Sequence, residues 1–282
     1  MAEVTAGGIR FHVQRLPAHC LSESTDHPAD SPTVVFVHGL VIDNMSSFYY
    51  TLANPAARAG ADVILYDLRG HGATERPPTG YSVEASVADL IRLLDAMGVT
   101  RPVHLVGNSF GGMVALALAI AHPTRVASLL VIEAPIELPT MTEDWEEQTA
   151  RVLAAESMEL RRGLSDWRAQ YGRKLHRVAT SIDALVCDTT LVADLRAQRP
   201  LRRADLQSVI CPVAAVYGDN SDIIHHGYTL MDLLPNCDLT VVPNCSHFLI
   251  VEAPGVLRDL LLRWLSSGAE AHLMPVKNAL VR

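Results

Sequence analysis

"HLVGNSFGGMVALALA", residues 104–119, joins an apolar run typical of a buried strand to an apolar run typical of a buried helix. Between the two runs stands Gly107-Asn108-Ser109-Phe110-Gly111, which satisfies the pattern G-x-S-x-G. A sharp turn from strand to helix would lift the Ser109 side chain out of the sheet, with the helix N-terminus facing any negative charge that develops beside it. The other interpretation is a nucleotide-binding crossover, but the stretch lacks the G-x-G-x-x-G spacing and a lysine. We therefore predict that Ser109 is a nucleophile.

The sequence around this stretch predicts a mostly parallel sheet. Six apolar runs are continuous rather than alternating, as in strands that are buried on both faces. They cover residues 33–39, 61–72, 101–109, 126–135, 211–220 and 237–244. Helical patterns lie between them, including 83–97, with Ser82 and Gly98 as caps, and 253–265. Strands that alternate with helices indicate an α/β fold with a doubly wound sheet flanked by helices. Residues 8–16 alternate and predict an edge strand.

The alternation is interrupted between residues 137 and 208, where the sequence contains helical patterns and no convincing buried strand. We expect this segment to be a helical cap inserted into a core formed by residues 1–136 and 209–265. Residues 266–282 are expected to be a C-terminal tail.

The amino-acid composition and charge of the chain indicate which classes of function and location to expect. The chain has 282 residues, 49% hydrophobic and 19% charged, with a net charge of −8. An acidic chain repels phosphates, so we expect a small-molecule substrate rather than nucleic acid. The N-terminus shows no signal-peptide pattern, and the longest apolar stretch is too short to cross a bilayer, so we expect a soluble cytoplasmic protein without membrane insertion. The five cysteines include no C-x-x-C pair and are interpreted as reduced thiols, Cys245 among them. We expect no cofactor and no metal.

Four separated motifs, in order, resemble those of the α/β-hydrolase superfamily. "VVFVHGL" (34–40) is similar to the family's oxyanion-loop entry, and "YDLRGHGATERP" (66–77) to the loop after the next strand. "VGNSFGG" (106–112) resembles the nucleophile elbow, and "VVPNCSHFLIVEAP" (241–254) the loop with the catalytic histidine. The resemblance covers most of residues 30–265. It implies that Ser109 is the nucleophile and His247 the base.

The acid of the triad is less well defined by this resemblance. The family order places it between serine and histidine, and "YGDNSDII" (217–224) offers Asp222 as first choice and Asp219 as second. In many relatives the acid stands three residues after the strand-end glycine, but that position is Ser221 here. Glu133 is a third candidate, because some relatives carry the acid after the preceding strand.

The resemblance also implies an oxyanion hole and a substrate pocket. The backbone N–H groups of Leu40 and Phe110 are the expected oxyanion donors. His38 either shapes the loop at the HG motif or contacts substrate. Three aromatic residues of the cap are candidates for an apolar pocket, with packing of the cap as the alternative for each: Trp145, Trp167 and Tyr171. The adjacent pair His225 and His226 is expected on a solvated surface rather than at a metal.

A serine at the elbow fits acyl transfer and argues against relatives that use aspartate there, such as haloalkane dehalogenases and epoxide hydrolases. We expect hydrolysis of an ester or thioester through an acyl-enzyme, on a hydrophobic small molecule or acyl chain. The alternatives are a thioesterase or acyltransferase step in biosynthesis, a hydrolase of carbon–carbon bonds in ring-cleavage products, and a non-catalytic binding protein. "HGLVIDNMSS" (38–47) lacks the Gly/Pro-rich oxyanion loop of the carbon–carbon hydrolases. Neither the natural substrate nor the oligomeric state follows from the sequence.

Overall fold

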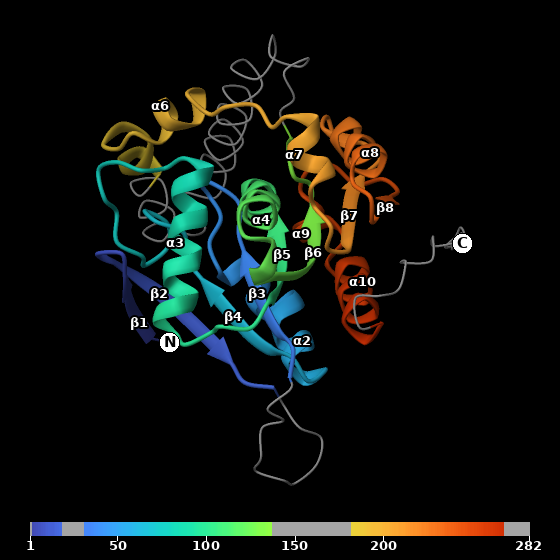
Figure 1. The fold of residues 1–282 in the computed structure, drawn as a ribbon, viewed down its shortest axis with the longest axis horizontal. Helices are drawn as coiled ribbons and strands as arrows, with labels where there is room; N and C mark the ends of the chain where they lie inside the picture. Colours follow the sequence, from blue (N-terminus) through green and yellow to red (C-terminus); the bar gives the residue numbers. More distant parts are fainter. Residues whose placement is uncertain (1, 19–30, 137–181, 268–282) are drawn as a thin grey trace, which may run out of the picture.

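The computed structural model describes residues 2–18, 31–136 and 182–267, and the statements below concern these residues. Eight strands form one sheet in the order β1-β2-β4-β3-β5-β6-β7-β8 (Figure 1). The strands are β1 (Ala2–Ala6), β2 (Ile9–Leu16), β3 (Thr33–Val37), β4 (Asp62–Tyr66), β5 (Val103–Asn108), β6 (Val126–Ile132), β7 (Val213–Gly218) and β8 (Cys237–Val242). Strands β3 to β8 are mutually parallel, whereas β1 and β2 pair antiparallel. The expected doubly wound, mostly parallel sheet is confirmed.

The N-terminal edge of the sheet differs from the prediction. Strand β2 was expected at the edge, but it lies between β4 and β1, and β1 itself was not predicted. The five residues of β1 alternate between apolar and polar side chains, but the run is short, has only one large apolar residue, Val4, and is mostly exposed, so the pattern is weak. Gly7 and Gly8, both with positive φ, form the tight turn that joins β1 to β2.

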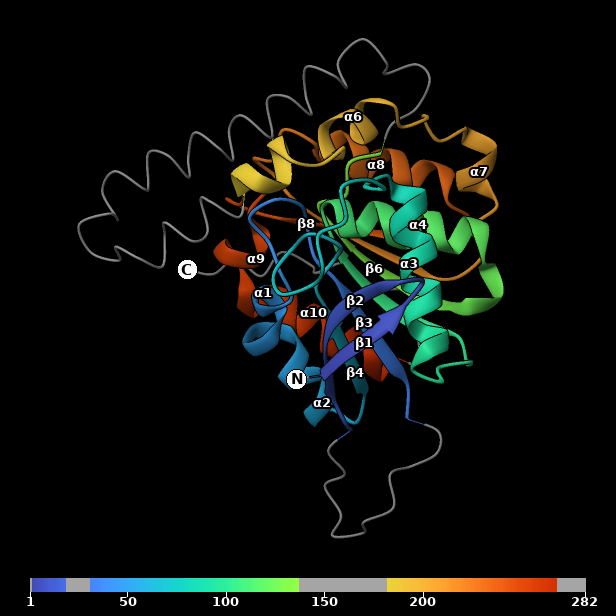
Figure 2. The same cartoon turned by 90° about the vertical axis from the view of Figure 1, so that its left-hand side faces the viewer.

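Helices cover both faces of the sheet (Figures 1 and 2). They are α1 (Ser46–Phe48), the π-helical turn η1 (Tyr49–Ala53), α2 (Asn54–Arg58), α3 (Val83–Ala96), α4 (Phe110–Ala121), the 3₁₀ turn η2 (Pro123–Arg125), α6 (Leu191–Arg196), α7 (Arg203–Gln207), α8 (Ile224–Leu233), α9 (Leu249–Glu252) and α10 (Pro254–Ser266). The predicted caps of α3 are confirmed, because Ser82 Oγ accepts a hydrogen bond from the Ala85 N–H at 3.2 Å and Gly98 has φ +70°.

The apolar side chains form one packed cluster on each face of the sheet. The larger cluster joins α3, α4 and α8 to the sheet, and the smaller joins α1, α2, α9 and α10 to the opposite face. Helix α4 is buried over most of its length, as its all-round apolar sequence predicts. The sheet therefore holds the ends of β5 and β6 rigidly between two layers of helices.

Much of the expected cap, residues 137–181, and most of the expected tail lie outside the described residues. The described remainder of the cap contains α6 and α7, and α7 contacts α4 and α8 of the core. Within the described part of the chain, no helix combines the length and apolarity needed to cross a membrane.

Candidate active site

Ser109 occupies the single position between the end of β5 and the start of α4. Its backbone has φ +51°, a left-handed conformation that side-chain-bearing residues rarely adopt. The Ser109 N–H donates to the Ile132 carbonyl oxygen at 2.8 Å, which continues the ladder between β5 and β6. The turn that the sequence predicted is therefore present, and it is fixed to the neighbouring strand.

The two glycines of the G-x-S-x-G pattern are required by close packing around this turn. A Cβ atom on Gly107 would lie 2.4 Å from the Gly111 carbonyl oxygen. A Cβ atom on Gly111 would lie 2.0 Å from the Val37 carbonyl oxygen at the end of β3. Any side chain at either position would push α4 away from the sheet and move Ser109.

His247 lies in the loop between β8 and α9 and connects Ser109 to a carboxylate. Its Nε2 is 3.2 Å from Ser109 Oγ, and its Nδ1 is 3.2 Å from Glu133 Oε2. The imidazole is partly exposed, with 24% of its side-chain surface accessible, whereas the Glu133 side chain is fully buried. The structure thus brings together Ser109 and His247 with Glu133, the third candidate for the acid.

Glu133 follows β6 directly and, like Ser109, has positive φ, at +50°. Its Oε1 accepts a hydrogen bond from the Gly218 N–H at 2.6 Å. Its Oε2 accepts one from the Ser221 hydroxyl, also at 2.6 Å, in addition to the contact with His247. Donors from the end of β7 therefore satisfy and orient this buried carboxylate.

The expectation that Asp222 or Asp219 contacts His247 is wrong. Asp222 is exposed, and Asp219 Oδ1 accepts from the Cys245 N–H at 3.3 Å. The turn after β7 directs Ser221, rather than either aspartate, inward to Glu133. Glu133 was the third candidate, named because some relatives carry the acid after the preceding strand.

The residues expected to supply the oxyanion donors, Leu40 and Phe110, belong to the two segments on either side of Ser109. Phe110 is the first residue of α4, where helical N–H groups have no partner within the helix. Leu40 lines the same cavity as Ser109. The N–H of the preceding residue, Gly39, is already used, because it donates to Asp43 Oδ2 at 2.7 Å.

Two buried histidines shape the loop that contains Leu40. His38 accepts a hydrogen bond from the Leu68 N–H through Nε2, and its Nδ1 contacts the Gly39 carbonyl oxygen. His71 Nε2 accepts from the Val41 N–H at 2.9 Å. His38 is fully buried and does not line the cavity at Ser109, so the expectation of a substrate contact is wrong and the loop-shaping interpretation holds.

A cavity opens beside Ser109 and His247. Its remaining described lining residues are Gly39, Leu40, Ile42, Asp43, Ser47, Asn108, Phe248, Ile250 and Val251. They come from the turn before α1 and α1 itself, from the loop before α9 and α9 itself, and from the elbow, and α1 and α9 lie side by side (Figure 2). The cap residues expected to contribute, Trp145, Trp167 and Tyr171, lie outside the described residues.

Two other predicted features can be checked. Burial raises the pKa of the Cys245 thiol, which disfavours the reactive thiolate and agrees with a structural role. His226 is buried rather than solvated, and burial together with neighbouring His225 lowers its pKa to about 4. The described part of the chain contains no cluster of three or more His, Cys, Asp or Glu side chains able to hold a metal.

Comparison with known proteins identifies relatives that are named as hydrolases. A protein of Variovorax paradoxus (strain S110) named as a carbamate hydrolase, RutD, is 37% identical over 38% of this chain, but the match spans only 40% of that relative. The Caulobacter sp. (strain K31) protein of the same name is 28% identical over 86% of this chain and 93% of its own length. The crystal structure of a hydrolase from Pseudomonas aeruginosa PA01 shares the fold, with a TM-score of 0.69, 24% identity and coverage of 94% of this chain and 97% of that one.

The match to a family model agrees with the fold and with the geometry of the site. The model of the alpha/beta hydrolase family matches residues 34–260. This range includes the strand before the HG motif, the elbow and the loop that carries His247. The chain belongs to the alpha/beta hydrolase family.

Proposed function

We propose that the protein hydrolyses a carboxylic ester or thioester through an acyl-enzyme, with Ser109, His247 and Glu133 as the catalytic triad. The observation that carries this proposal is the continuous hydrogen-bonded chain from Ser109 Oγ through both ring nitrogens of His247 to Glu133 Oε2. Nucleophilic acyl transfer requires a serine hydroxyl, an imidazole and a buried carboxylate hydrogen-bonded in this order.

The geometry supports an ordinary two-step reaction. Ser109 Oγ attacks the carbonyl carbon while His247 Nε2 takes the hydroxyl proton, and His247 then gives that proton to the leaving alcohol or thiol. A water molecule, deprotonated by His247, then attacks the acyl-enzyme. The carboxylic acid product leaves, and His247 returns the proton to Ser109. Glu133 holds His247 with Nδ1 protonated and stabilises the imidazolium. The N–H groups of Leu40 and Phe110 receive the oxyanion in both steps.

The nucleophile is tested by covalent labelling. A fluorophosphonate probe is expected to label the protein at Ser109 and to abolish its esterase activity. The Ser109→Ala variant is expected to take no label. Labelling that persists in this variant would show that another residue is the nucleophile.

The acid is tested by three isosteric substitutions. Glu133→Gln is expected to lower kcat at least about a hundredfold, because the amide no longer stabilises the imidazolium and can favour the wrong tautomer. Asp222→Asn and Asp219→Asn, which remove equal charge from the turn after β7, are the matched controls and are expected to change kcat less than about threefold. A larger loss in Asp222→Asn than in Glu133→Gln would return the role to Asp222.

The substrate class is tested by a panel of p-nitrophenyl esters, acyl thioesters, aryl carbamates and a ring-fission dienone. Ile42, Phe248, Ile250 and Val251 line the cavity and favour an apolar acyl group. Carbamates are included because two of the relatives are named as carbamate hydrolases. An initial burst of p-nitrophenol, equal to the enzyme concentration, is expected from an acyl-enzyme. A non-catalytic binding protein would release none, and a carbon–carbon hydrolase would decolorise the dienone in preference to cleaving the esters.

A further inference from the structure

A carboxylate stands in the wall of the cavity that contains the proposed nucleophile. Asp43 lies in the loop between β3 and α1, and it lines the cavity together with Ser109 and His247. Among the lining residues that the structure describes, Asp43 has the only acidic side chain and none is lysine or arginine. The catalytic mechanism above assigns no role to this charge.

Asp43 is close to the nucleophile. A Cβ atom placed on Gly39 would lie 3.2 Å from Asp43 Oδ2, 3.4 Å from Asn108 Nδ2 and 3.5 Å from Ser109 Cβ. The carboxylate and Ser109 therefore flank the same small volume of space above Gly39. An acyl group attached to Ser109 has its first few carbon atoms within the reach of this charge.

The contacts of Asp43 hold the carboxylate in place, and within the described residues they include no cation. It accepts hydrogen bonds from the backbone N–H groups of Gly39, at 2.7 Å, and Asn44, at 2.9 Å. The hydroxyl of Ser47 also donates to it, and Asn108 Nδ2 lies at 3.5 Å. All four partners are neutral donors, as an ionised carboxylate requires, and no ion pair within the described residues includes Asp43.

We propose that Asp43 is a specificity-determining residue that excludes acyl groups with a negative charge near the scissile carbonyl. This inference rests on the proposed ester or thioester hydrolysis at Ser109. Like charges a few ångströms apart repel strongly in a partly buried site. An acyl carboxylate would meet Asp43, whereas the apolar side chains of Ile42, Phe248 and Ile250 accept a hydrocarbon chain. The substrates that fit this cavity are esters or thioesters of uncharged, mainly apolar acids.

The test compares three p-nitrophenyl esters whose acyl groups have similar length and different charge. They are the neutral pentanoate, the anionic monoglutarate and the cationic 4-(trimethylammonio)butanoate, with each rate corrected for spontaneous hydrolysis. The unaltered protein is expected to favour the neutral ester over the anionic ester at least about tenfold in kcat/KM at low ionic strength. Asp43→Asn is expected to reduce this preference at least about fivefold and to lower relative activity on the cationic ester.

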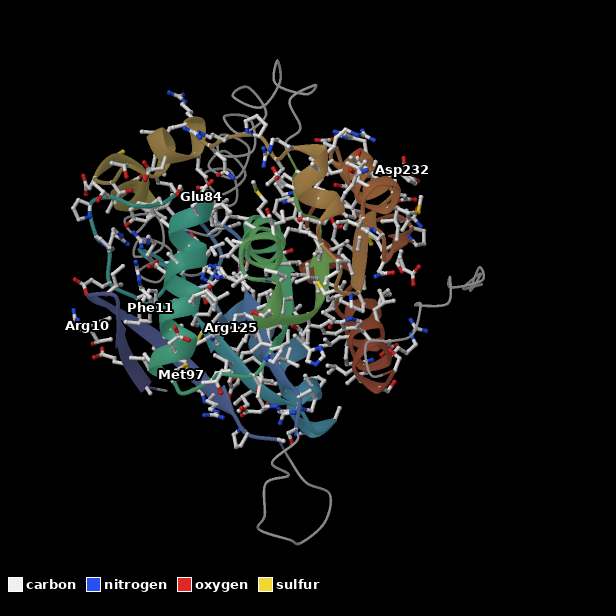
Figure 3. All side chains as sticks on the ribbon, viewed as in Figure 1. Arg10, Phe11, Glu84, Met97, Arg125 and Asp232 are labelled. Atoms are coloured by element: carbon white, nitrogen blue, oxygen red, sulfur yellow. The ribbon has the colours of Figure 1, made fainter. Side chains whose placement is uncertain are left out.

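Asp232→Asn is the matched control, because Asp232 is an exposed aspartate on α8 whose side chain points away from the body of the molecule (Figure 3). It removes the same charge and is expected to leave all three ratios unchanged. If Asp43→Asn fails to fold, the salt dependence of the unaltered protein serves instead: added NaCl is expected to raise activity on the anionic ester relative to the neutral one.

The outcomes separate this inference from the function on which it rests. Equal loss of activity on all three esters in Asp43→Asn would show that Asp43 only holds the loop, and would overturn the inference. Equal hydrolysis of neutral and anionic esters by the unaltered protein would overturn it as well. If the unaltered protein hydrolysed no ester or thioester, the proposed function would fail, and the inference with it.

Discussion

At the scale of single residues, the buried carboxylate of Glu133 has three donors around it. His247 Nδ1 and the Ser221 hydroxyl share Oε2, while the Gly218 N–H occupies Oε1. A carboxylate without solvent around it needs such partners to remain ionised. The ionised form is the one that stabilises a protonated His247. Ser221 therefore acts on the proposed reaction through Glu133.

We predict that Ser221→Ala lowers kcat about tenfold and leaves KM nearly unchanged. The loss of one of two donors to Oε2 weakens the position of Glu133, but the Gly218 N–H still holds the other oxygen. Steady-state kinetics on a p-nitrophenyl ester measures the effect, and a shift in the acidic limb of the pH profile distinguishes it from general destabilisation. Ser208→Ala, which removes a surface hydroxyl that bonds only a local carbonyl, is the control. Unchanged kcat in Ser221→Ala would remove Ser221 from the mechanism.

Residue identity predicted that Ser109 and His247 lie together, but not that Glu133 is the carboxylate beside His247. Ser109 and His247 stand in motifs whose local backbone fixes where the side chain points. The turn after β7 contains two aspartates, and spacing along the chain does not indicate which side chain turns inward. The inward position is filled by Ser221, and the carboxylate that contacts His247 is Glu133, which follows the adjacent strand β6. The departure at Ser221 is visible in the sequence, but it left Asp222 as the first choice and did not show that Glu133 is the carboxylate beside His247.

At the scale of elements, the site is built where the carboxyl ends of parallel strands meet. Ser109 follows β5, Glu133 follows β6 and Ser221 follows β7. Backbone hydrogen bonds continue past the strand ends, from the Ser109 N–H to the Ile132 oxygen and from the Glu133 N–H to the Val216 oxygen. The pairing of β6 with β7 consequently brings Glu133 and Ser221 into contact beside His247.

We predict that the acid can be moved from one strand end to the next. Glu133→Gln alone is expected to lose most of kcat, and the double variant Glu133→Gln/Ser221→Asp to regain at least about tenfold. The Ser221 side chain already reaches to within 2.6 Å of Glu133 Oε2, so a carboxylate there comes close to His247 Nδ1. The kcat values of the folded variants, matched by circular dichroism, give the result.

The control for this exchange is Glu133→Gln/Asn220→Asp, which adds the same charge at the exposed neighbouring position. It is expected to stay as inactive as Glu133→Gln. Recovery in both double variants would mean that any added negative charge suffices, and recovery in neither would place the acid function at Glu133 alone.

The elements themselves were predictable to different degrees. Strands β3 to β7 have nearly continuous apolar sequences because helices bury both faces, so their pattern is strong, whereas the edge strand β8 is only partly buried. The edge strand β1 is mostly exposed and obtains its stability from pairing with β2, which its own sequence does not reveal. Packing between distant segments, such as Gly111 against Val37, is also absent from any local pattern.

At the scale of the whole molecule, the loop between β3 and α1 lines the cavity on one side and is hydrogen-bonded to the buried side chains of Asp67 and His71 on the other. Asp67 Oδ1 accepts a hydrogen bond from the Met45 N–H, and His71 Nε2 accepts one from the Val41 N–H. Val41 has φ +64°, a conformation that this contact helps to maintain. The shape of the proposed oxyanion loop thus depends on a neutral His71, which is almost fully buried.

This dependence predicts how stability varies with pH. Burial, with a further contribution from neighbouring His38, lowers the pKa of His71 from 6.5 to about 3 in the folded protein. In the unfolded chain, His71 takes up a proton as the pH falls below 6.5, whereas the folded state excludes that proton. The contribution of His71 to stability is therefore complete above pH 6.5 and decreases as the pH falls towards 3, by about 1.4 kcal/mol per pH unit in the middle of this range.

The test is urea unfolding of the unaltered protein and of His71→Gln at pH 6, 5 and 4. Glutamine can accept the Val41 N–H hydrogen bond but does not titrate, so the variant is expected to lose about 2–3 kcal/mol less than the unaltered protein between pH 6 and 4. The comparison of slopes remains valid even if His71→Gln is less stable at every pH. Parallel curves for the two proteins would contradict the prediction, because they would mean that His71 binds its proton equally well in the folded and unfolded states.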